Sequence, residues 1–297
     1  MTTDTSARTG LPSTGWARFA PLLTVTLWSG NTIVTKSAAA VIEPASIAFY
    51  RWGLALLLLT PFLGRAVWQR RAIVHQHWPR LAVLGALGMA VYQGLAYEAA
   101  RTTSAVNMGV IVALMPLMAA LLANLLSGEG LTGRRILGAV LSLAGLVVLV
   151  TAGDPRRLID GGVHVGDGLM IIAVFANALY GVLLKRWPIG LTTWQQLYCQ
   201  IAFGTLLILP FWLVTPISPV TPQNLPLVLF AAILASLLAP YLWIRGVKAL
   251  GAARATLFIN LLPLIVAFLA WLVLGEHLHA YHAIGGVIAL VGVAIAL

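Results

Sequence analysis

Charged residues are scarce in this chain of 297 residues: Asp, Glu, Lys and Arg together make up 9% of it. A typical soluble domain has about 25%, and it needs them to cover its surface. Apolar residues instead make up 60%, in blocks long enough to cross a bilayer, which takes about 20 residues each. The composition excludes an ordinary soluble globular enzyme and predicts a polytopic helical membrane protein.

Cysteine is almost absent. With Cys199 alone, the chain can form neither an intramolecular disulfide nor a cysteine-rich metal site. The histidines and carboxylates lie at predicted span ends or in loops. His277 and His282 could be imagined as a metal site, but a polar loop at the water interface is the better interpretation. Nucleophile elbows and phosphate loops are missing. We therefore expect no enzyme, no catalytic residues, no metal and no cofactor.

The net charge of +10 is not a nucleic-acid signal, because the basic residues lie mostly in short loops between apolar blocks. There they act as orientation signals. One side of the predicted topology collects thirteen Lys and Arg and the other four, while Arg51 lies inside a span. The distribution predicts a multi-pass membrane protein with both termini in the cytoplasm.

Window hydropathy predicts about ten spans, and they are helical because lipid offers no partners for backbone polar groups. The expected ranges are 18–38, 44–63, 80–98, 104–126, 132–151, 166–186, 191–212, 225–245, 252–274 and 280–297. Residues 1–17 predict a disordered cytoplasmic tail and not a signal peptide. A periplasmic linker, 153–165, divides spans one to five (18–152) from spans six to ten (166–297).

The two halves repeat. Aligning 105–145 with 252–292 gives 15 identities in 41 positions, and Pro116 and Pro263 are among the pairs. The first spans align at a shift of 149, which pairs Lys36 with Lys185. Because each unit has five spans, equivalent helices must run in opposite directions. The sequence predicts an all-α integral membrane protein of two inverted five-helix repeats, the architecture of many secondary transporters.

A family resemblance rests on motifs that occur in both halves. They are Leu114-x-Pro116-Leu117, Gly128-Glu129, Gly138 and Gly145, repeated as Leu261-x-Pro263-Leu264, Gly275-Glu276, Gly285 and Gly292, after Trp28-Ser29-Gly30-Asn31 and Phe49-Tyr50-Arg51. Over nearly the whole chain this pattern resembles two tandem EamA-type domains of the drug/metabolite transporter superfamily. Within it, the sequence is most similar to YddG-type exporters of aromatic amino acids.

Polar and aromatic residues near the middle of predicted spans are candidates for a substrate cavity. They are Trp28, Asn31, Tyr92, Gln93, Asn177, Tyr180, Tyr241, Phe258 and Asn260. Aromatic walls with neutral amides suit a mostly apolar zwitterion, whereas a sugar phosphate would want several central Lys or Arg. Ordinary helix packing is the alternative explanation for these positions.

Two basic residues lie within spans. Lys36, near the outer end of span one, is expected to extend to water. Arg51 is expected to bond helix-end carbonyls or Glu43, with contact to a substrate carboxylate as the alternative. No Asp, Glu or His lies at the middle of a span, so we expect transport down the substrate gradient or weak coupling.

Pro116 and Pro263 lie inside predicted spans four and nine. Proline removes a backbone hydrogen bond and bends a helix. The two residues are therefore candidate hinges for alternating access, with static kinks as the alternative.

The expected function is secondary export of aromatic or hydrophobic amino acids and related metabolites across the inner membrane. Its partners are then a small-molecule substrate and membrane lipid, and no nucleic acid. A drug or lipophilic-cation exporter is the first alternative, although Glu98 is the only near carboxylate. A receptor or scaffold is the second, and it has no need of two inverted halves.

Overall fold

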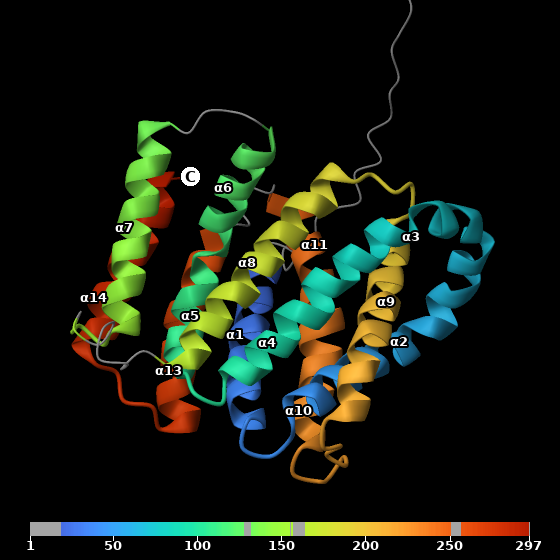
Figure 1. The fold of residues 1–297 in the computed structure, drawn as a ribbon, viewed down its shortest axis with the longest axis horizontal. Coiled ribbons are helices and arrows are strands. Elements are labelled where there is room, and N and C mark those ends of the chain that lie inside the picture. The colour runs from blue at the N-terminus through green and yellow to red at the C-terminus, as the bar shows by residue number, and fades with distance from the viewer. Residues whose placement is uncertain (1–18, 128–131, 155, 157–163, 251–256, 297) are drawn as a thin grey trace, which may run out of the picture.

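The computed structural model describes residues 19–127, 132–154, 156, 164–250 and 257–296 (Figure 1). The predicted tail at 1–17, most of the linker and the Gly128-Glu129 motif lie outside this part of the chain. Within it, all regular elements are helical, as the predicted fold class requires.

The first half contains five consecutive spans. Their elements are α1 (Ala20–Ala38), α2 (Pro44–Gln69), α3 (Arg71–Gly85) continued by η2 (Ala86–Val91) and α4 (Tyr92–Ala99), α5 (Ala105–Ala113) followed by α6 (Met115–Ser127), and α7 (Gly133–Val150).

The second half repeats this order. Its elements are α8 (Val165–Arg186), α9 (Thr193–Val214), α10 (Leu225–Leu229) continued by η4 (Phe230–Leu238) and α11 (Ala239–Leu250), η5 (Leu257–Leu261) followed by α13 (Leu262–Leu269) and η6 (Ala270–Leu274), and α14 (Ala280–Ala296). Within the described residues, six of these spans are long and apolar enough to cross a membrane by length and composition, and three further apolar helices are shorter.

The loop expected after span two is helical instead. Helix α2 continues to Gln69 and α3 begins at Arg71, so His75 and His77 lie on a helix. Hydropathy marks where the apolar residues end, and a helix can continue past that point because Arg, His and Gln tolerate helical conformation at a wet surface. Hydropathy therefore predicted the apolar stretch and not the helix ends.

Helices α7 and α14 cross antiparallel through facing glycines. A Cβ at Gly145 would lie 2.6 Å from the carbonyl oxygen of Gly285, and one at Gly292 would lie 2.6 Å from that of Gly138. The shift of 147 residues exchanges these two contacts, since Gly138 corresponds to Gly285 and Gly145 to Gly292. Small residues let helices approach closely in lipid, so the repeated glycines form a pseudo-symmetric seam between the halves.

Helices α2 and α9 form a second pair of equivalent elements in contact. Phe49 stacks on Trp212 with ring centroids 4.3 Å apart, while the hydroxyls of Thr60 and Tyr198 are 3.1 Å apart. Residue numbers increase along α2 while those of the contacted residues on α9 decrease, so these two helices are antiparallel as well. Figure 1 shows the α7–α14 pair at one end of the view and α2–α9 at the other.

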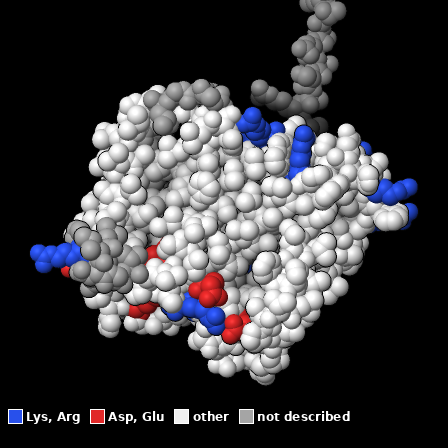
Figure 2. Space-filling view, in the orientation of Figure 1, with Lys and Arg blue, Asp and Glu red and all other residues white. Residues whose placement is uncertain are grey.

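Charge separates the two rims of the bundle. Figure 2 shows Lys and Arg along the upper rim, acidic and basic groups mixed at the lower rim, and uncharged surface between them. Arg186 at the end of α8 donates to the carbonyl of Leu126 at the upper rim. Glu43, Glu98 and Arg101 form ion pairs at the lower rim.

Candidate functional site

Arg51 occupies the centre of a buried polar cluster. Its side chain on α2 is 3% exposed. Nε donates to Ser236 Oγ at 2.7 Å, while Nη1 donates to Gln93 Oε1 at 2.9 Å, Asn31 Oδ1 at 3.2 Å and the hydroxyl of Tyr97 at 3.4 Å. The cluster thus joins α1, α2 and α4 of the first repeat to η4 of the second.

The expected partners of Arg51 were wrong. Glu43 pairs instead with Arg101, at 3.0 Å, and all four hydrogen-bond partners of Arg51 are neutral side chains. Among the described residues, no carboxylate forms an ion pair with Arg51. An ionisable residue inside a membrane protein is costly to keep, and it usually marks a functional site.

Two π-helical segments shape the surroundings of this cluster. Element η2 directly precedes Tyr92 and Gln93, and η4 contains Ser236, whose hydroxyl donates to the carbonyl of Ala231 five residues earlier. A π-turn adds a residue to the helix and often occurs at functional sites. Here the two segments lie in equivalent spans, three and eight, of the two repeats.

Aromatic side chains lie on the same helices as the cluster. Trp28 on α1 precedes Asn31 by three residues, and its ring centroid is 5.6 Å from that of Trp243 on α11. Phe258 packs against the same apolar group as Trp28, and both are only partly buried. Trp28 and Phe258 thus border one apolar cluster, and the ring that Trp28 contacts is that of Trp243, which was not among the predicted residues.

The remaining predicted residues lie in other places. Tyr180 on α8 donates to Gln200 Oε1 at 2.9 Å and packs over Gly88, and Asn177 donates to Met115 Sδ at 3.3 Å. Tyr92, partly buried at the start of α4, is the exception, because it lies close enough to Arg51 to interact with its charge. The side chain of Asn260 lies outside the described part of the structure.

Tyr241 lies apart from the Arg51 cluster. It is 36% exposed, and its hydroxyl accepts a hydrogen bond of 3.0 Å from Arg245 Nε. Trp194, at the start of α9, is its aromatic neighbour, with centroids 6.4 Å apart. No residue of the cluster is among these contacts.

The sequence reading missed Tyr97 and Ser236 as partners of Arg51. Tyr97 follows Gln93 by four residues, which places the two on one helix face. Ser236 is a lone hydroxyl in the apolar run of span eight. Helical spacing could have found the first, but only the tertiary packing of η4 against α2 reveals the second.

Both candidate hinge prolines follow a helix break. Helix α5 ends at Ala113 and α6 begins at Met115, so Pro116 is the second residue of a new helix. Pro263 is likewise the second residue of α13, after the 3₁₀ turn η5. A proline at this position loses no internal hydrogen bond, so spans four and nine are discontinuous at equivalent places.

A second polar group surrounds the start of α5. The φ of +67° at Gly275 ends η6 in a left-handed turn. The next carboxylate, that of Glu276, accepts hydrogen bonds from the backbone N–H groups of Ala105 at 2.8 Å and Val106 at 3.2 Å. The Gly-Glu motif thus caps the start of α5 across the boundary between the repeats.

Lys36 does not extend to water as expected. Its Nζ donates to the carbonyl oxygens of Ala100 at 2.7 Å and Thr103 at 2.6 Å. These carbonyls follow the C-terminus of α4, where a cation is favourable. Lys36 therefore ties the end of α1 to the α4–α5 turn.

Asp167 is the second acidic group at this turn, and its side chain is fully buried in the first turn of α8. It accepts hydrogen bonds from the hydroxyl of Thr103 and from Asn107 Nδ2, the latter at 3.1 Å. His164 lies 3.7 Å from its other oxygen. The sequence placed Asp167 at a span end but did not predict its burial.

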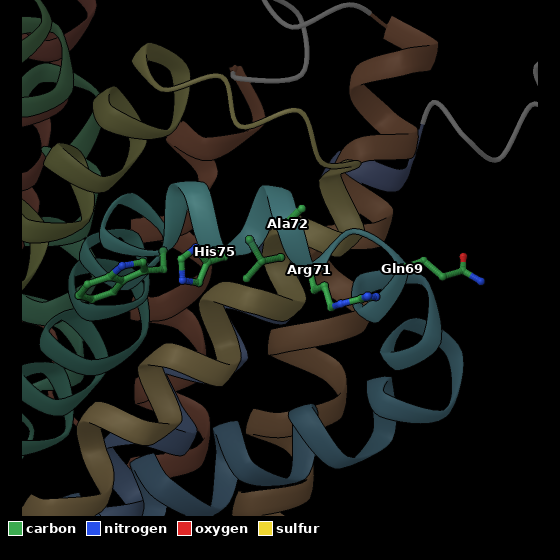
Figure 3. Close-up of a pocket in the computed structure, with 6 residues that line it drawn as sticks. Gln69, Arg71, Ala72 and His75 are labelled. Atoms are coloured by element: carbon green, nitrogen blue, oxygen red, sulfur yellow. The ribbon is translucent and has the colours of Figure 1, made fainter.

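Two pockets lie away from the Arg51 cluster. One of about 790 Å³ lies at the α2–α3 corner, where Figure 3 shows Gln69, Arg71, Ala72 and His75. Its exposed aromatic and basic groups are typical of a membrane interface. A smaller cavity of about 250 Å³ beside the start of α5 is bordered by Asn107, His164, Glu276 and His282. Within the described residues, no group of three His, Cys, Asp or Glu side chains can hold a metal.

The fold and the site together define a class of protein. Two pseudo-symmetric halves, discontinuous helices at equivalent places and a buried polar cluster between them are the features of a secondary transporter.

The chain belongs to the EamA-like transporter family, whose pattern matches residues 15–151 and 164–297. An uncharacterized transporter of Archaeoglobus fulgidus is 29% identical over 277 residues, 91% of this chain and 93% of that one. Protein PecM of Dickeya dadantii is 32% identical over 214 residues, 69% of each chain.

A probable terminal-alkyne amino-acid exporter of Streptantibioticus cattleyicolor is 24% identical over 218 residues, 72% of this chain and 71% of that one. One crystal structure shares the fold, with a TM-score of 0.58 and 22% identity, and covers 94% of this chain and 96% of that one. These similarities support membrane transport of a small molecule.

Proposed function

We propose that the protein exports aromatic and hydrophobic amino acids and related metabolites across the bacterial inner membrane. Transport proceeds by alternating access, with both termini in the cytoplasm. The observation that supports the substrate class most directly is the Arg51 cluster. It combines one buried positive charge, neutral amides and nearby aromatic rings.

The charge of the cluster favours a zwitterion over a lipophilic cation. A cation would need a carboxylate or an uncharged aromatic cage, and it would be repelled by Arg51 at short range. Glu98 is 3.5 Å from Arg101 at the outer rim and is exposed there. The described residues thus give the centre a positive group with no acidic one beside it.

The aromatic rings favour a side chain of similar character. Trp28, Trp243 and Phe258 come from α1, α11 and η5, so both repeats contribute. Aromatic pairs are stabilised beyond the burial of their area. The relative described as a probable amino-acid exporter agrees with this substrate class, as does the resemblance to YddG-type exporters.

Proteoliposomes test the proposal. Purified protein is reconstituted, vesicles are loaded with unlabelled phenylalanine, and uptake of labelled phenylalanine by exchange is measured. We expect uptake that unlabelled Trp and Leu reduce and that tetraphenylphosphonium does not. If the vesicles exchange labelled tetraphenylphosphonium and exchange no amino acid, the protein is instead a cation exporter.

A further inference from the structure

We propose that Arg51, Asn31 and Gln93 form a binding site for the carboxylate of the substrate. A ligand then needs a carboxylate to bind. The amide, the ester and the decarboxylated amine of a substrate amino acid are therefore excluded. The proposal rests on the proposed function for its substrate, and it names the atoms and the chemical group that select that substrate.

The first argument is the uncompensated charge. Arginine stays protonated in proteins, and a buried charge is stable only when it is paired and hydrogen-bonded. Arg51 has its hydrogen bonds, but within the described residues it has no anion. A substrate carboxylate would supply the missing charge, and its departure would leave the hydrogen bonds to neutral groups in place.

The second argument is the orientation of the two amides. A guanidinium group has only N–H donors, so Asn31 and Gln93 must both turn their oxygens toward Nη1. Their NH₂ groups then point away from Nη1. Arg51 thereby fixes two further donors that have no hydrogen bond among the described residues.

The third argument is access. Nη2 of Arg51 also has no hydrogen bond in the described part of the chain. The unpartnered side-chain atoms that are fully enclosed there are Asn107 Oδ1, Asp167 Oδ2, Gln196 Nε2 and Trp212 Nε1. Nη2 and the two amide nitrogens are not among them, so each retains an open side. Arg51 on α2, Asn31 on α1 and Gln93 on α4 thus each keep a donor that a ligand can reach.

The donor set matches the geometry of a carboxylate. A guanidinium group presents its N–H bonds in a planar fork that fits two carboxylate oxygens, and charge-assisted hydrogen bonds are the strong ones. Trp28 lies three residues before Asn31, on the same side of α1. A bound amino acid can therefore place its carboxylate at Arg51 and its side chain toward Trp28 and Trp243.

The experiment compares four probes for binding to the purified protein in lipid nanodiscs by calorimetry. They are phenylalanine, phenylalanine amide, phenylacetate and phenethylamine. We expect phenylalanine to bind at least about tenfold more tightly than its amide, the loss that follows from removing a charged hydrogen-bond partner. Phenylacetate should bind and phenethylamine should not.

Two variants separate binding from folding. Arg51→Gln removes the charge and should abolish the preference for the carboxylate. Asn31→Asp keeps Arg51 but gives it a permanent internal anion, so this variant should also lose the preference for the carboxylate. It replaces Arg51→Gln in the test if that variant fails to fold. Asn224→Asp is the matched control, because among the described residues the hydrogen bonds of that buried side chain stay within its own loop, at Pro219 and Thr221. It should bind like the wild type.

The outcomes distinguish the two proposals. Equal binding of phenylalanine and its amide to the wild type, or an unchanged preference in Asn31→Asp, overturns the carboxylate site, even if amino acids are exported. Binding of phenylacetate without binding of any amino acid supports the carboxylate site and overturns the proposed function.

Discussion

The Glu276 carboxylate lies 2.8 Å from the backbone nitrogen of Ala105, although 171 residues separate them. The contact joins the end of η6 in the second repeat to the start of α5 in the first. Lys36 and Asp167 hold the same α4–α5 turn from α1 and α8. This end of the bundle is therefore held together by polar groups from both repeats.

Replacing Glu276 tests this fastening. Glu276→Ala removes the acceptor for two backbone N–H groups and should destabilise the protein by about 0.5–2 kcal/mol, as loss of a helix cap does. Glu276→Gln keeps one acceptor oxygen and should lie between that variant and the wild type. The measurement is thermal unfolding in detergent. Glu98→Ala is the control, and an equal effect of both alanine variants would contradict a specific role for the cap.

The glycine seam between α7 and α14 gives a second prediction. Gly145→Val places side-chain atoms against the backbone of Gly285, and overpacking typically costs about 1–3 kcal/mol. Gly286→Val is the matched control, because the nearest atom to its Cβ would be Val110 Cγ2 at 3.7 Å. Only Gly145→Val should lower the unfolding temperature and the yield of folded protein. Similar stability of the two variants would show that the seam tolerates separation.

Much of this architecture could be predicted from the sequence, and the reasons are physical. Six of the described spans can be recognised by apolar length, and the shift of 147 residues identifies the four glycines, Gly138, Gly145, Gly285 and Gly292, that form the α7–α14 seam. Pro116 and Pro263 marked the places where helices break. These features depend on local residue types, which sequence reasoning can evaluate one segment at a time.

The residues around Arg51 were harder to predict from the sequence. Asn31 and Gln93 were chosen as polar residues in apolar spans, yet Arg51, their shared partner, was expected to bond helix-end carbonyls or Glu43. Which polar group meets Arg51 depends on how four helices pack. The π-turn in η4 adds to the difficulty, because it shifts Ser236 out of the ordinary helical register. Burial of Asp167 likewise depends on the α4–α5 turn and not on its own sequence neighbourhood.

The topology prediction is that both termini are cytoplasmic. It is tested in intact cells by replacing the buried Cys199 and adding single cysteines at Gly133 or Leu278, both exposed. An impermeant thiol reagent should label the Leu278→Cys variant from outside and the Gly133→Cys variant only after the membrane is opened. Labelling of both from outside would contradict the inverted arrangement, and the reverse pattern would invert the proposed orientation.

The helix breaks at Pro116 and Pro263 predict a kinetic effect. Alanine restores a backbone N–H and favours a continuous helix through each break. The double replacement should keep or raise the unfolding temperature while lowering the rate of phenylalanine exchange. If exchange continues at the wild-type rate, the breaks are packing features and access changes by motion elsewhere.

The last prediction concerns the ring of Trp28, which lies beside that of Trp243. If substrates place their side chains there, Trp28→Ala removes an aromatic contact that typically adds about 0.5–1.5 kcal/mol beyond area burial. Competition by Phe and Trp for labelled substrate should then weaken by about two- to twelvefold more than competition by Leu or Ala.

Trp68→Ala is the control for this test, because Trp68 is 69% exposed near the end of α2 and should leave selectivity unchanged. An equal loss for all four competitors would mean that Trp28 supports the packing of α1 without contacting the substrate side chain. The selectivity for aromatic substrates would then have to come from residues other than this ring, since Arg51 and its amides contact only the group that all amino acids share.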